Sequence, residues 1–429
     1  MLMKASFFTE NRRKLLSLLE ENSIAIVHSS AEVRRTADQF FPYRQHSDIL
    51  YFTGITQSET WLVLCPSHPD ISLREALFVK PSNAHDLLWN GSILSTDEAS
   101  LISGVSTCYP NSFLFEYLKN IPNGCQSVFL NVSEKEIQTI SESGISNAFI
   151  AELELLFPQI EKKSLSETVA SLRVQKSDYE IEQIEIACRI AHQGFRKAIS
   201  SIKSGNYEYQ VRAELVGEFL RQGAVGESFH TISASGANAC VLHYSDNKTQ
   251  LKEGSLLLLD FGAELPTGYA SDVTRTISIG GKFTPRQRQL YESTLRVYRR
   301  AEHLFIPGNT IANINAEVSR FWQDEHIELG LYTQVEADAA PVDAPLWKQF
   351  YPHGTSHFLG LDVHDVGSRD VVLQPGMVLT CEPGIYIRSE GIGIRLENDL
   401  LITEQAPHNL TADIPIEIAD IEALMACYE

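Results

Sequence analysis

Positive charge, long apolar runs and paired cysteines are all scarce in this sequence. Its 429 residues carry 35 Lys and Arg against 55 Asp and Glu, which gives a formal net charge of −20. Nucleic acid and anionic membranes are therefore disfavoured as partners, because most of this surface would repel a polyanion. The longest apolar stretches, such as residues 256–259, are far shorter than a membrane span, and residues 1–10 lack the pattern of a signal peptide.

Several catalytic and binding motifs are absent as well. The seven cysteines are scattered and never have CxxC spacing, which argues against a disulfide framework and a cysteine-ligated zinc site. The sequence contains no HExxH, no GxxxxGKS/T loop and no GxSxG turn, which excludes the zincin, P-loop and nucleophile-elbow motifs. We therefore expect an acidic, soluble protein of a reducing compartment, the cytoplasm.

Two segments of different pattern follow one another along the chain. In the first, short apolar runs bounded by turn-forming residues predict the strands of an α/β layer, at residues 24–27, 50–52, 61–65, 76–79 and 128–132. The pattern changes near residue 165. We predict an α/β domain over residues 1–170 and a second, larger domain over residues 171–429.

Two helix starts are clearly marked after this boundary. Ser177 and Glu180 have the spacing of a capping box, and an apolar stripe with helical spacing follows them. A second helix is predicted to begin at Thr284–Pro285, where Gln287 completes another capping box and proline occupies the first helical position.

Two predicted hairpins each bring a pair of acidic residues together. In the first, a strand over residues 254–262 contains Asp260, and the strand that returns from the following turn contains Asp272. If the turn is centred on Pro266, the two aspartates lie directly opposite each other. Like charges opposed on one face are destabilising unless a positive group lies between them.

The second hairpin repeats this arrangement with glutamates. Residues 377–384 and 391–397 predict two strands, and direct pairing places Glu382 opposite Glu397. Strand alternation puts Arg395 on the same face as Glu397. Taken alone, either hairpin is more simply interpreted as strands that expose acidic residues to solvent.

Histidines gather next to these strands. His353, His357 and His364, three of the 13 histidines, fall in one short window whose glycines favour a loop, and His243 precedes the first aspartate strand. Four carboxylates with a neutral imidazole suit two divalent ions that share carboxylates. An oxygen-rich ligand set favours Mn²⁺, with Zn²⁺ and Co²⁺ as alternatives. We therefore predict a dinuclear metal site.

At these residues the sequence resembles the aminopeptidase P and prolidase branch of the pita-bread metallopeptidases, a group that includes methionine aminopeptidase. The resemblance covers nearly the whole chain. In the C-terminal part it rests on Leu259-Asp260-Phe-Gly262, Ser271-Asp272-Val-Thr-Arg275-Thr276, His353-Gly-Thr-Ser-His357, Leu361-Asp-Val-His364-Asp, Glu382-Pro-Gly384 and Gly393-Ile-Arg395-Leu-Glu397. In the N-terminal part it rests on Tyr43-Arg-Gln-His-Ser-Asp48 and Tyr51-Phe-Thr-Gly54.

The resemblance implies a fold and a ligand set. The fold is an α/β N-terminal domain followed by an α+β pita-bread catalytic domain with a curved, mainly antiparallel sheet. The ligands of the two ions would be Asp260, Asp272, His357, Glu382 and Glu397. Asp272 and Glu397 would bridge the ions, a bridging hydroxide would attack the peptide, and Glu382 would transfer the proton.

One spacing departs from the family. The two aspartates are usually separated by one residue fewer than the eleven that lie between them here. An extra residue in the turn at 265–268 would explain the difference without moving a ligand, whereas an insertion within a strand would require a bulge.

Other roles also follow from the resemblance. His243 and His364 would contact the substrate and stabilise the developing oxyanion, and His353 would shape the pocket. Arg395 would orient the carboxylates, unless it is an ordinary strand charge. The implied reaction is release of the N-terminal residue from peptides that have proline in second position. The family also implies a homodimer or homotetramer.

Three alternatives remain. A prolidase, which cleaves only Xaa–Pro dipeptides, shares the catalytic motifs, and the motif at residues 43–54 favours aminopeptidase P over it. A methionine aminopeptidase does not need the preceding domain. A metal-free pita-bread binding module should show replaced ligands, and none of the five positions is replaced.

Overall fold

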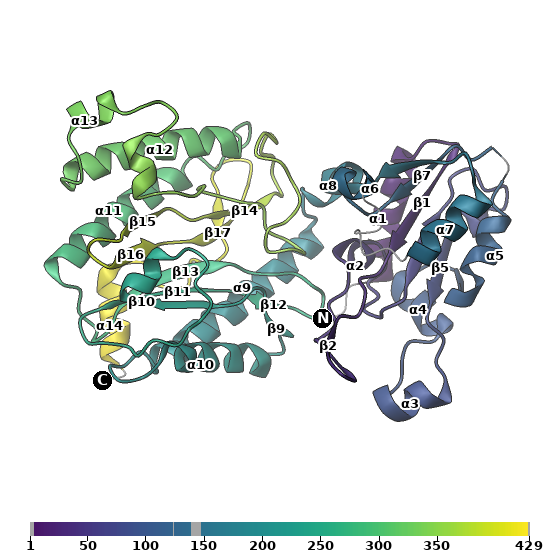
Figure 1. The fold of residues 1–429 in the computed structure, drawn as a ribbon, viewed down its shortest axis with the longest axis horizontal. Helices are drawn as coiled ribbons and strands as arrows, with labels where there is room; N and C mark the ends of the chain where they lie inside the picture. Colours follow the sequence, from purple (N-terminus) through teal and green to yellow (C-terminus); the bar gives the residue numbers. More distant parts are fainter. Residues whose placement is uncertain (1–3, 123, 139–146, 428–429) are drawn as a thin grey trace. The chain divides into compact units, whose positions relative to one another are not determined.

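The structure, a computed structural model, describes residues 4–122, 124–138 and 147–427 (Figure 1). The chain forms two compact units, residues 1–173 and 174–429. Among the described helices, none combines the length and the hydropathy needed to cross a bilayer.

The first unit is built on one mixed six-stranded sheet. Its strand order is β6-β5-β4-β1-β7-β8, and the pairs β5–β6, β1–β7 and β7–β8 are parallel. The strands are β1 (Ser23–His28), β4 (Trp61–Leu64), β5 (Glu75–Val79), β6 (Thr107–Pro110), β7 (Ser127–Leu130) and β8 (Glu161–Ser164). A separate hairpin is formed by β2 (Arg34–Thr36) and β3 (Gln39–Phe40).

Helices flank this sheet. They are α1 (Ala5–Leu18), α2 (Ser47–Thr53), α3 (Ala84–Asn90), α4 (Thr96–Ser103), α5 (Leu114–Lys119), α6 (Glu134–Gln138), α7 (Asn147–Leu156) and α8 (Ser166–Arg173). Buried apolar residues of β1, β4, β5 and β7 form a core with α5 and α7. The α/β character predicted for this part of the chain is confirmed.

One predicted strand of the first unit is wrong. Residues 50–52 lie in the helix α2 and not in a strand. The apolar, aromatic run matches a strand, but both ends of the helix are capped. The His46 side chain accepts a hydrogen bond from the Asp48 N–H, and Gly54 adopts the left-handed conformation that ends helices.

The second unit contains two long helices whose starts were predicted. Ser177 and Glu180 form a capping box at the start of α9 (Asp178–Ile199). Thr284 and Gln287 form one at the start of α11 (Pro285–Glu302). The remaining helices of the unit are α10 (Glu208–Arg221), α12 (Ile311–Glu328), α13 (Gln334–Ala339) and α14 (Ile418–Ala426).

The strands of the second unit all pair in antiparallel fashion in the part of the chain that the structure describes. They form the sheets β10-β11-β13, β14-β17-β18, β15-β16 and β12-β9. The strands are β9 (Gly226–Glu227), β10 (Ile232–Ser235), β11 (Leu256–Phe261), β12 (Ala263–Glu264), β13 (Val273–Ser278), β14 (Val378–Cys381), β15 (Gly384–Ile387), β16 (Ile392–Arg395), β17 (Asn398–Leu401) and β18 (His408–Asn409).

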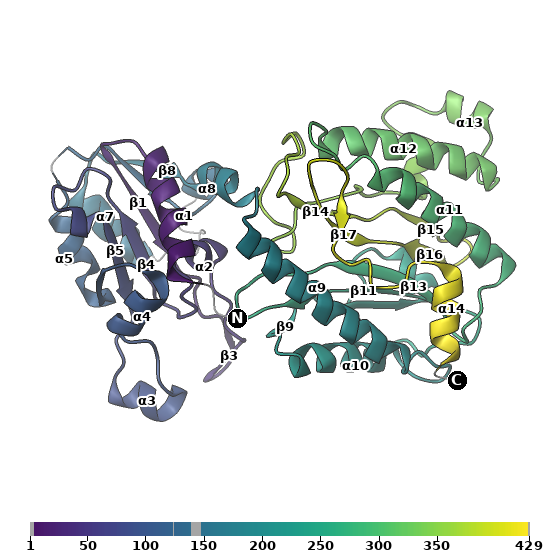
Figure 2. The ribbon, with the colours of Figure 1, turned by 180° about the vertical axis from the view of Figure 1, so that it is seen from behind.

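These small sheets act as one curved layer. Strands β16 and β17 both contact β13, which joins the β10-β11-β13 sheet to the other two. Helices α9, α10 and α11 cover one face of the layer, the face turned toward the viewer in Figure 2, and share a single apolar core with it. The opposite face is free to carry polar side chains, and the predicted mainly antiparallel α+β architecture is confirmed.

Candidate active site

The two glutamates lie opposite each other because two ladders share one register. Cys381 pairs with Asn398 at the end of β14–β17, and Gly384 pairs with Arg395 at the start of β15–β16. Glu382 and Glu397 fall between these ladders, together with Pro383 and Leu396, and continue the same register. This is the arrangement that the sequence predicted for the second hairpin.

The two aspartates are not directly opposite each other, because the register differs from the predicted one by two residues. Asp260 pairs with Thr274, so Asp272 is its diagonal neighbour and the predicted direct opposition is wrong. The turn is centred on Thr267 and not on Pro266, because the Leu265 N–H donates to the carbonyl of Tyr269. A shift of two residues keeps both side chains on one face. The ladder runs without a bulge from Leu256 to Phe261, and the position of the extra residue in the turn stays a prediction.

His357 reaches this face from an extended segment beside β14. The Thr380 N–H donates to the His357 carbonyl at 2.9 Å, and the Glu382 N–H donates to the Thr355 carbonyl at 2.9 Å. The segment therefore runs antiparallel to β14. His357 is opposite Thr380, and strand alternation places its side chain on the same face as Glu382.

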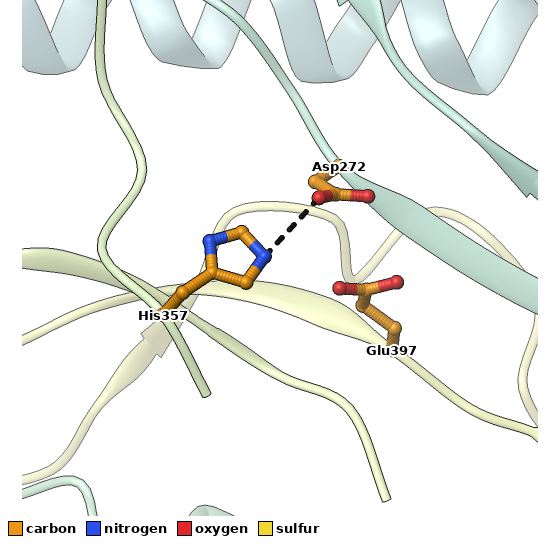
Figure 3. A group of neighbouring side chains, drawn as sticks. All are labelled: Asp272, His357 and Glu397. Atoms are coloured by element: carbon orange, nitrogen blue, oxygen red, sulfur yellow. Dashed lines mark ion pairs between the residues drawn. The ribbon is translucent and has the colours of Figure 1, made fainter. Parts of the chain in front are cut away.

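Three of these side chains converge closely. His357 Nε2 lies 3.4 Å from Asp272 Oδ2 and 3.9 Å from Glu382 Oε1. One ligand atom from each of Asp272, His357 and Glu397 lies within 4.8 Å of the other two. Figure 3 shows the two carboxylates facing each other and the imidazole pointing toward them.

The carboxylates repel one another in a buried setting. Burial raises the pKa of Asp272 and of Glu397 well above the usual carboxyl range, and repulsion from neighbouring carboxylates raises both further. Burial also raises the pKa of Glu382. Oδ1 of Asp260 is buried and accepts no hydrogen bond from the described residues. The cluster therefore has unused ligand atoms and needs positive charge.

The state of His357 suits a metal ligand. Its Nδ1 lies 3.0 Å from the carbonyl of Phe358, which can only accept, so Nδ1 carries the proton. In the neutral ring the lone pair is then on Nε2, the nitrogen that faces Asp272 and Glu382. An imidazole held in this tautomer beside four carboxylates fits divalent cations.

A hydrogen-bond chain lies beside the carboxylates. Arg395 forms a buried ion pair with Asp260 and donates to the Tyr386 hydroxyl at 2.8 Å. The hydroxyl donates to Nε2 of His353 at 2.8 Å, and Nδ1 of His353 donates to the Gly354 carbonyl at 2.7 Å. Burial lowers the pKa of His353 to about 3. His353 is therefore neutral, and both of its ring nitrogens are engaged.

The remaining histidines line a cavity of about 700 Å³ together with the carboxylates. The ring centroids of His364 and His357 are 4.2 Å apart. Burial and the neighbouring His357 and His243 lower the pKa of His364. His243 enters the cavity lining from the loop that follows β10. The structure thus brings together all nine residues that the sequence singled out.

Three residues near the cluster were not singled out. The Thr274 hydroxyl donates to Glu397 Oε2 at 2.6 Å and accepts from Arg395 Nε at 3.0 Å. Asp399 accepts the backbone N–H of Asp272 at 3.0 Å. The Thr380 hydroxyl accepts the His357 N–H at 3.2 Å. Each lies two positions from a predicted ligand on its strand, so period-two alternation was the signal that could have found it.

A cavity lined by buried carboxylates and histidines on a curved antiparallel sheet defines a class of metallopeptidase. Residues 182–404 match metallopeptidase family M24, and residues 8–129 match the aminopeptidase P N-terminal domain. The chain belongs to metallopeptidase family M24, and the predicted metallo-aminopeptidase is confirmed at that level.

Relatives named as aminopeptidases match nearly the whole length of the chain. The Xaa-Pro aminopeptidase of Escherichia coli (strain K12) is 35% identical over 432 residues, which cover 97% of each chain. Xaa-Pro aminopeptidase 3 of Homo sapiens is 30% identical, covering 96% of this chain and 84% of its own. The structure of zinc-substituted E. coli aminopeptidase P in complex with product superimposes with a TM-score of 0.88, 32% identity and full coverage of both chains. These matches favour aminopeptidase P over prolidase.

Proposed function

We propose that this protein is an Xaa-Pro aminopeptidase, which releases the N-terminal residue from peptides with proline in second position. The observation that carries the proposal is the convergence of four carboxylates and His357 on one wall of a cavity that His243 and His364 also line. The names of the relatives support the substrate class. In this proposal residues 171–429 form the catalytic domain, and residues 1–170 form an aminopeptidase P-type N-terminal domain.

The proposed cofactor is a pair of divalent ions, with Mn²⁺ favoured over Zn²⁺ and Co²⁺ because most donors are oxygens. Asp272 and Glu397 would bridge the ions, Asp260 would complete one site, and His357 and Glu382 the other. When bound, the ions lower the pKa of water and supply a nucleophile at neutral pH.

The proposed role of Glu382 is proton transfer. Its Oε1 lies 3.9 Å from His357 Nε2 and its side chain lines the cavity, where the attacking water would be held. Attack forms a bond between the water oxygen and the carbonyl carbon of the first residue. Glu382 takes the proton of that water and delivers it to the proline nitrogen, so that the C–N bond breaks and leaves a secondary amine.

The histidines of the cavity lining suit the developing negative charge. Burial and the neighbouring His357 and His243 lower the pKa of His364, which favours the uncharged ring, and this ring can donate one N–H to the oxyanion. His243 lines the same cavity and can donate from another direction. His353 is already bound on both nitrogens, and its proposed role is to hold Tyr386 and the pocket wall in place.

Proline in second position changes what the enzyme can recognise. The Xaa–Pro bond is a tertiary amide and has no N–H, so a site that requires this donor cannot bind it. The proposed partners are therefore proline-containing peptides, and no nucleic acid or membrane. We also propose a homodimer or homotetramer, and a cytoplasmic location that the free state of all seven cysteines supports.

The test is one mass-spectrometric digest with added Mn²⁺. It contains an Xaa–Pro–Xaa oligopeptide, an Xaa–Pro dipeptide and a matched peptide without proline. We expect the oligopeptide to lose one residue, the peptide without proline to remain intact, and EDTA to suppress the reaction. Cleavage of the dipeptide alone would assign a prolidase. No cleavage by folded, metal-loaded protein would favour a binding module.

A further inference from the structure

A buried carboxylate outside the cavity lining holds the loop that carries His243. Glu208 is the first residue of α10 and its side chain has no exposed surface. It accepts five hydrogen bonds, all from neutral donors. Oε1 accepts from the N–H (2.7 Å) and hydroxyl (2.7 Å) of Ser235 and from Asn238 Nδ2 (3.0 Å), and Oε2 accepts from the Tyr244 hydroxyl (2.8 Å) and the Thr249 N–H (2.9 Å).

These donors lie at both ends of one loop. Ser235 ends β10, Thr249 lies just before the bridge that pairs residue 250 with residue 207, and His243 lies between them. Tyr244, the neighbour of His243, donates to the same carboxylate. A single side chain thus fixes the two ends and the middle of the segment.

A second contact supports the same loop. Asn247 has a φ of 47°, in the left-handed region that few residues adopt. Its side chain is buried, accepts the Ser233 N–H at 2.9 Å and donates to the Thr231 carbonyl at 2.8 Å. By contrast, none of the described residues forms a hydrogen bond with the His243 ring. The place of that ring therefore depends on the loop.

We propose that Glu208 is a positioning residue for His243. The proposal rests on the proposed function, in which His243 contacts the substrate. A carboxylate that accepts five donors and forms no ion pair with the described residues is held in one position. Glutamine at this place would put an NH₂ group against N–H and O–H donors, leave several of them unsatisfied and let the loop move. The substrate contact of His243 would then be misplaced.

The test is a double-mutant cycle on the full-length, Mn²⁺-loaded protein with an Xaa–Pro–Xaa peptide. We expect Glu208→Gln to lower kcat/KM by about 10- to 100-fold, the range that follows from a small misplacement of a substrate contact. In a His243→Ala background the same substitution should cost less than about threefold, because the two residues act as one unit. Bound metal should not change. Equal losses in both backgrounds, or no effect of His243→Ala, would overturn the proposal.

Two further variants keep the test decisive. Glu325→Gln is the matched control, because Glu325 is another buried glutamate of this unit, but it accepts hydrogen bonds from Arg296, and neither residue lines the cavity. We expect it to leave the activity unchanged. If Glu208→Gln does not fold, Tyr244→Phe takes its place in the cycle, since it removes one donor next to His243. The same two outcomes then support or overturn the proposal.

An NMR measurement separates this inference from the proposed function. In ¹³C-histidine-labelled protein, the ring signal of His243 is assigned by its absence from His243→Ala. We expect that signal to shift or broaden in Glu208→Gln and to stay in place in Glu325→Gln. An unchanged signal would overturn the role of Glu208 whether or not the protein cleaves peptides. Absence of cleavage by the parent protein would contradict only the proposed function.

Discussion

Two groups of residues in the cavity lining are built in different ways. The carboxylate cluster (Asp260, Asp272, Glu382 and Glu397) projects from strands, or from positions directly beside them, and its members repel one another. The histidine group (His243, His353 and His364) lies on irregular segments. Burial lowers the pKa of both His353 and His364, and neighbouring histidines lower each pKa further. A cluster of carboxylates is suited to hold cations, and a group of imidazoles is suited to donate hydrogen bonds to a substrate.

We therefore expect mutations in the carboxylate cluster to affect metal binding and mutations in the histidine group to affect substrate turnover. The largest expected effect is that of Asp272→Ala or Glu397→Ala. Each should lower turnover by at least about a thousandfold, because loss of a bridging carboxylate removes several kcal/mol of transition-state stabilisation. Metal content per chain should fall with it, as measured by plasma mass spectrometry.

Glu397→Ala should also differ from the parent in its stability toward urea. In EDTA, Glu397→Ala should unfold at the same or a higher urea concentration than the parent, because one of four mutually repelling buried carboxylates is gone. Normal metal content with normal activity would contradict the assignment of these residues as bridges.

Two histidines with adjacent rings provide the next test. His364→Ala should lower kcat by about 10²- to 10³-fold, as expected for loss of one oxyanion donor, and should retain its metal. His357→Ala, although it changes the same residue type in the same loop region, should lose metal. Measuring metal content and kcat in both variants checks the comparison. Loss of metal from His364→Ala would move His364 to the ligand set.

A smaller effect is expected from Thr274→Val, which keeps the side-chain shape and removes the hydroxyl between Arg395 and Glu397. We expect metal affinity to fall by about 10- to 100-fold, as for other groups that orient a ligand. Thr294→Val is the control, because Thr294 is equally buried but donates only to the Leu290 carbonyl within α11. Competition with a fluorescent chelator gives both affinities.

The smallest effect on turnover is expected at a histidine that does not line the cavity. His326 is buried beside Trp322 and Tyr332, and burial lowers its pKa to about 3 from 6.5. The unfolded chain therefore binds this proton first as pH falls. The stability that neutral His326 contributes is complete above pH 6.5 and is lost as pH falls toward 3.

The measurement at His326 is urea unfolding of the parent and of His326→Phe from pH 7 to pH 4. The parent should lose more stability over this range than the variant, and kcat at pH 7 should be the same in both. A loss of kcat in His326→Phe would show that effects on turnover are not confined to the cavity.

The carboxylate cluster, whose members lie on strands or directly beside them, was easier to predict from sequence than the histidine group. Alternation along a strand follows directly from sequence, so the shared faces of Asp260 with Asp272 and of Glu382 with Glu397 could be predicted. The register of the first hairpin could not, because it depends on which residue is at the centre of the turn, here Thr267. The predicted register was wrong by two residues, and because side chains alternate with a period of two, Asp260 and Asp272 still share one face.

Loop-borne features were harder to predict from sequence. The chain from Arg395 through Tyr386 to His353 depends on tertiary contacts across 33 residues, and no local pattern reveals it. Glu208 and the loop before Thr249 are likewise joined over 41 residues. Residues 50–52 form part of a helix that is capped by His46 and Gly54, although their apolar run is typical of a strand.

The most direct test of this account is anomalous X-ray diffraction from Mn²⁺-soaked crystals at the manganese edge. We predict two strong anomalous peaks per chain. Both should lie among Asp260, Asp272, His357, Glu382 and Glu397, with Asp272 and Glu397 between them and no peak at His243 or His364. A single peak, or a peak coordinated by the histidine group, would contradict the assignment of metal binding to the carboxylate cluster and of substrate binding to the histidine group.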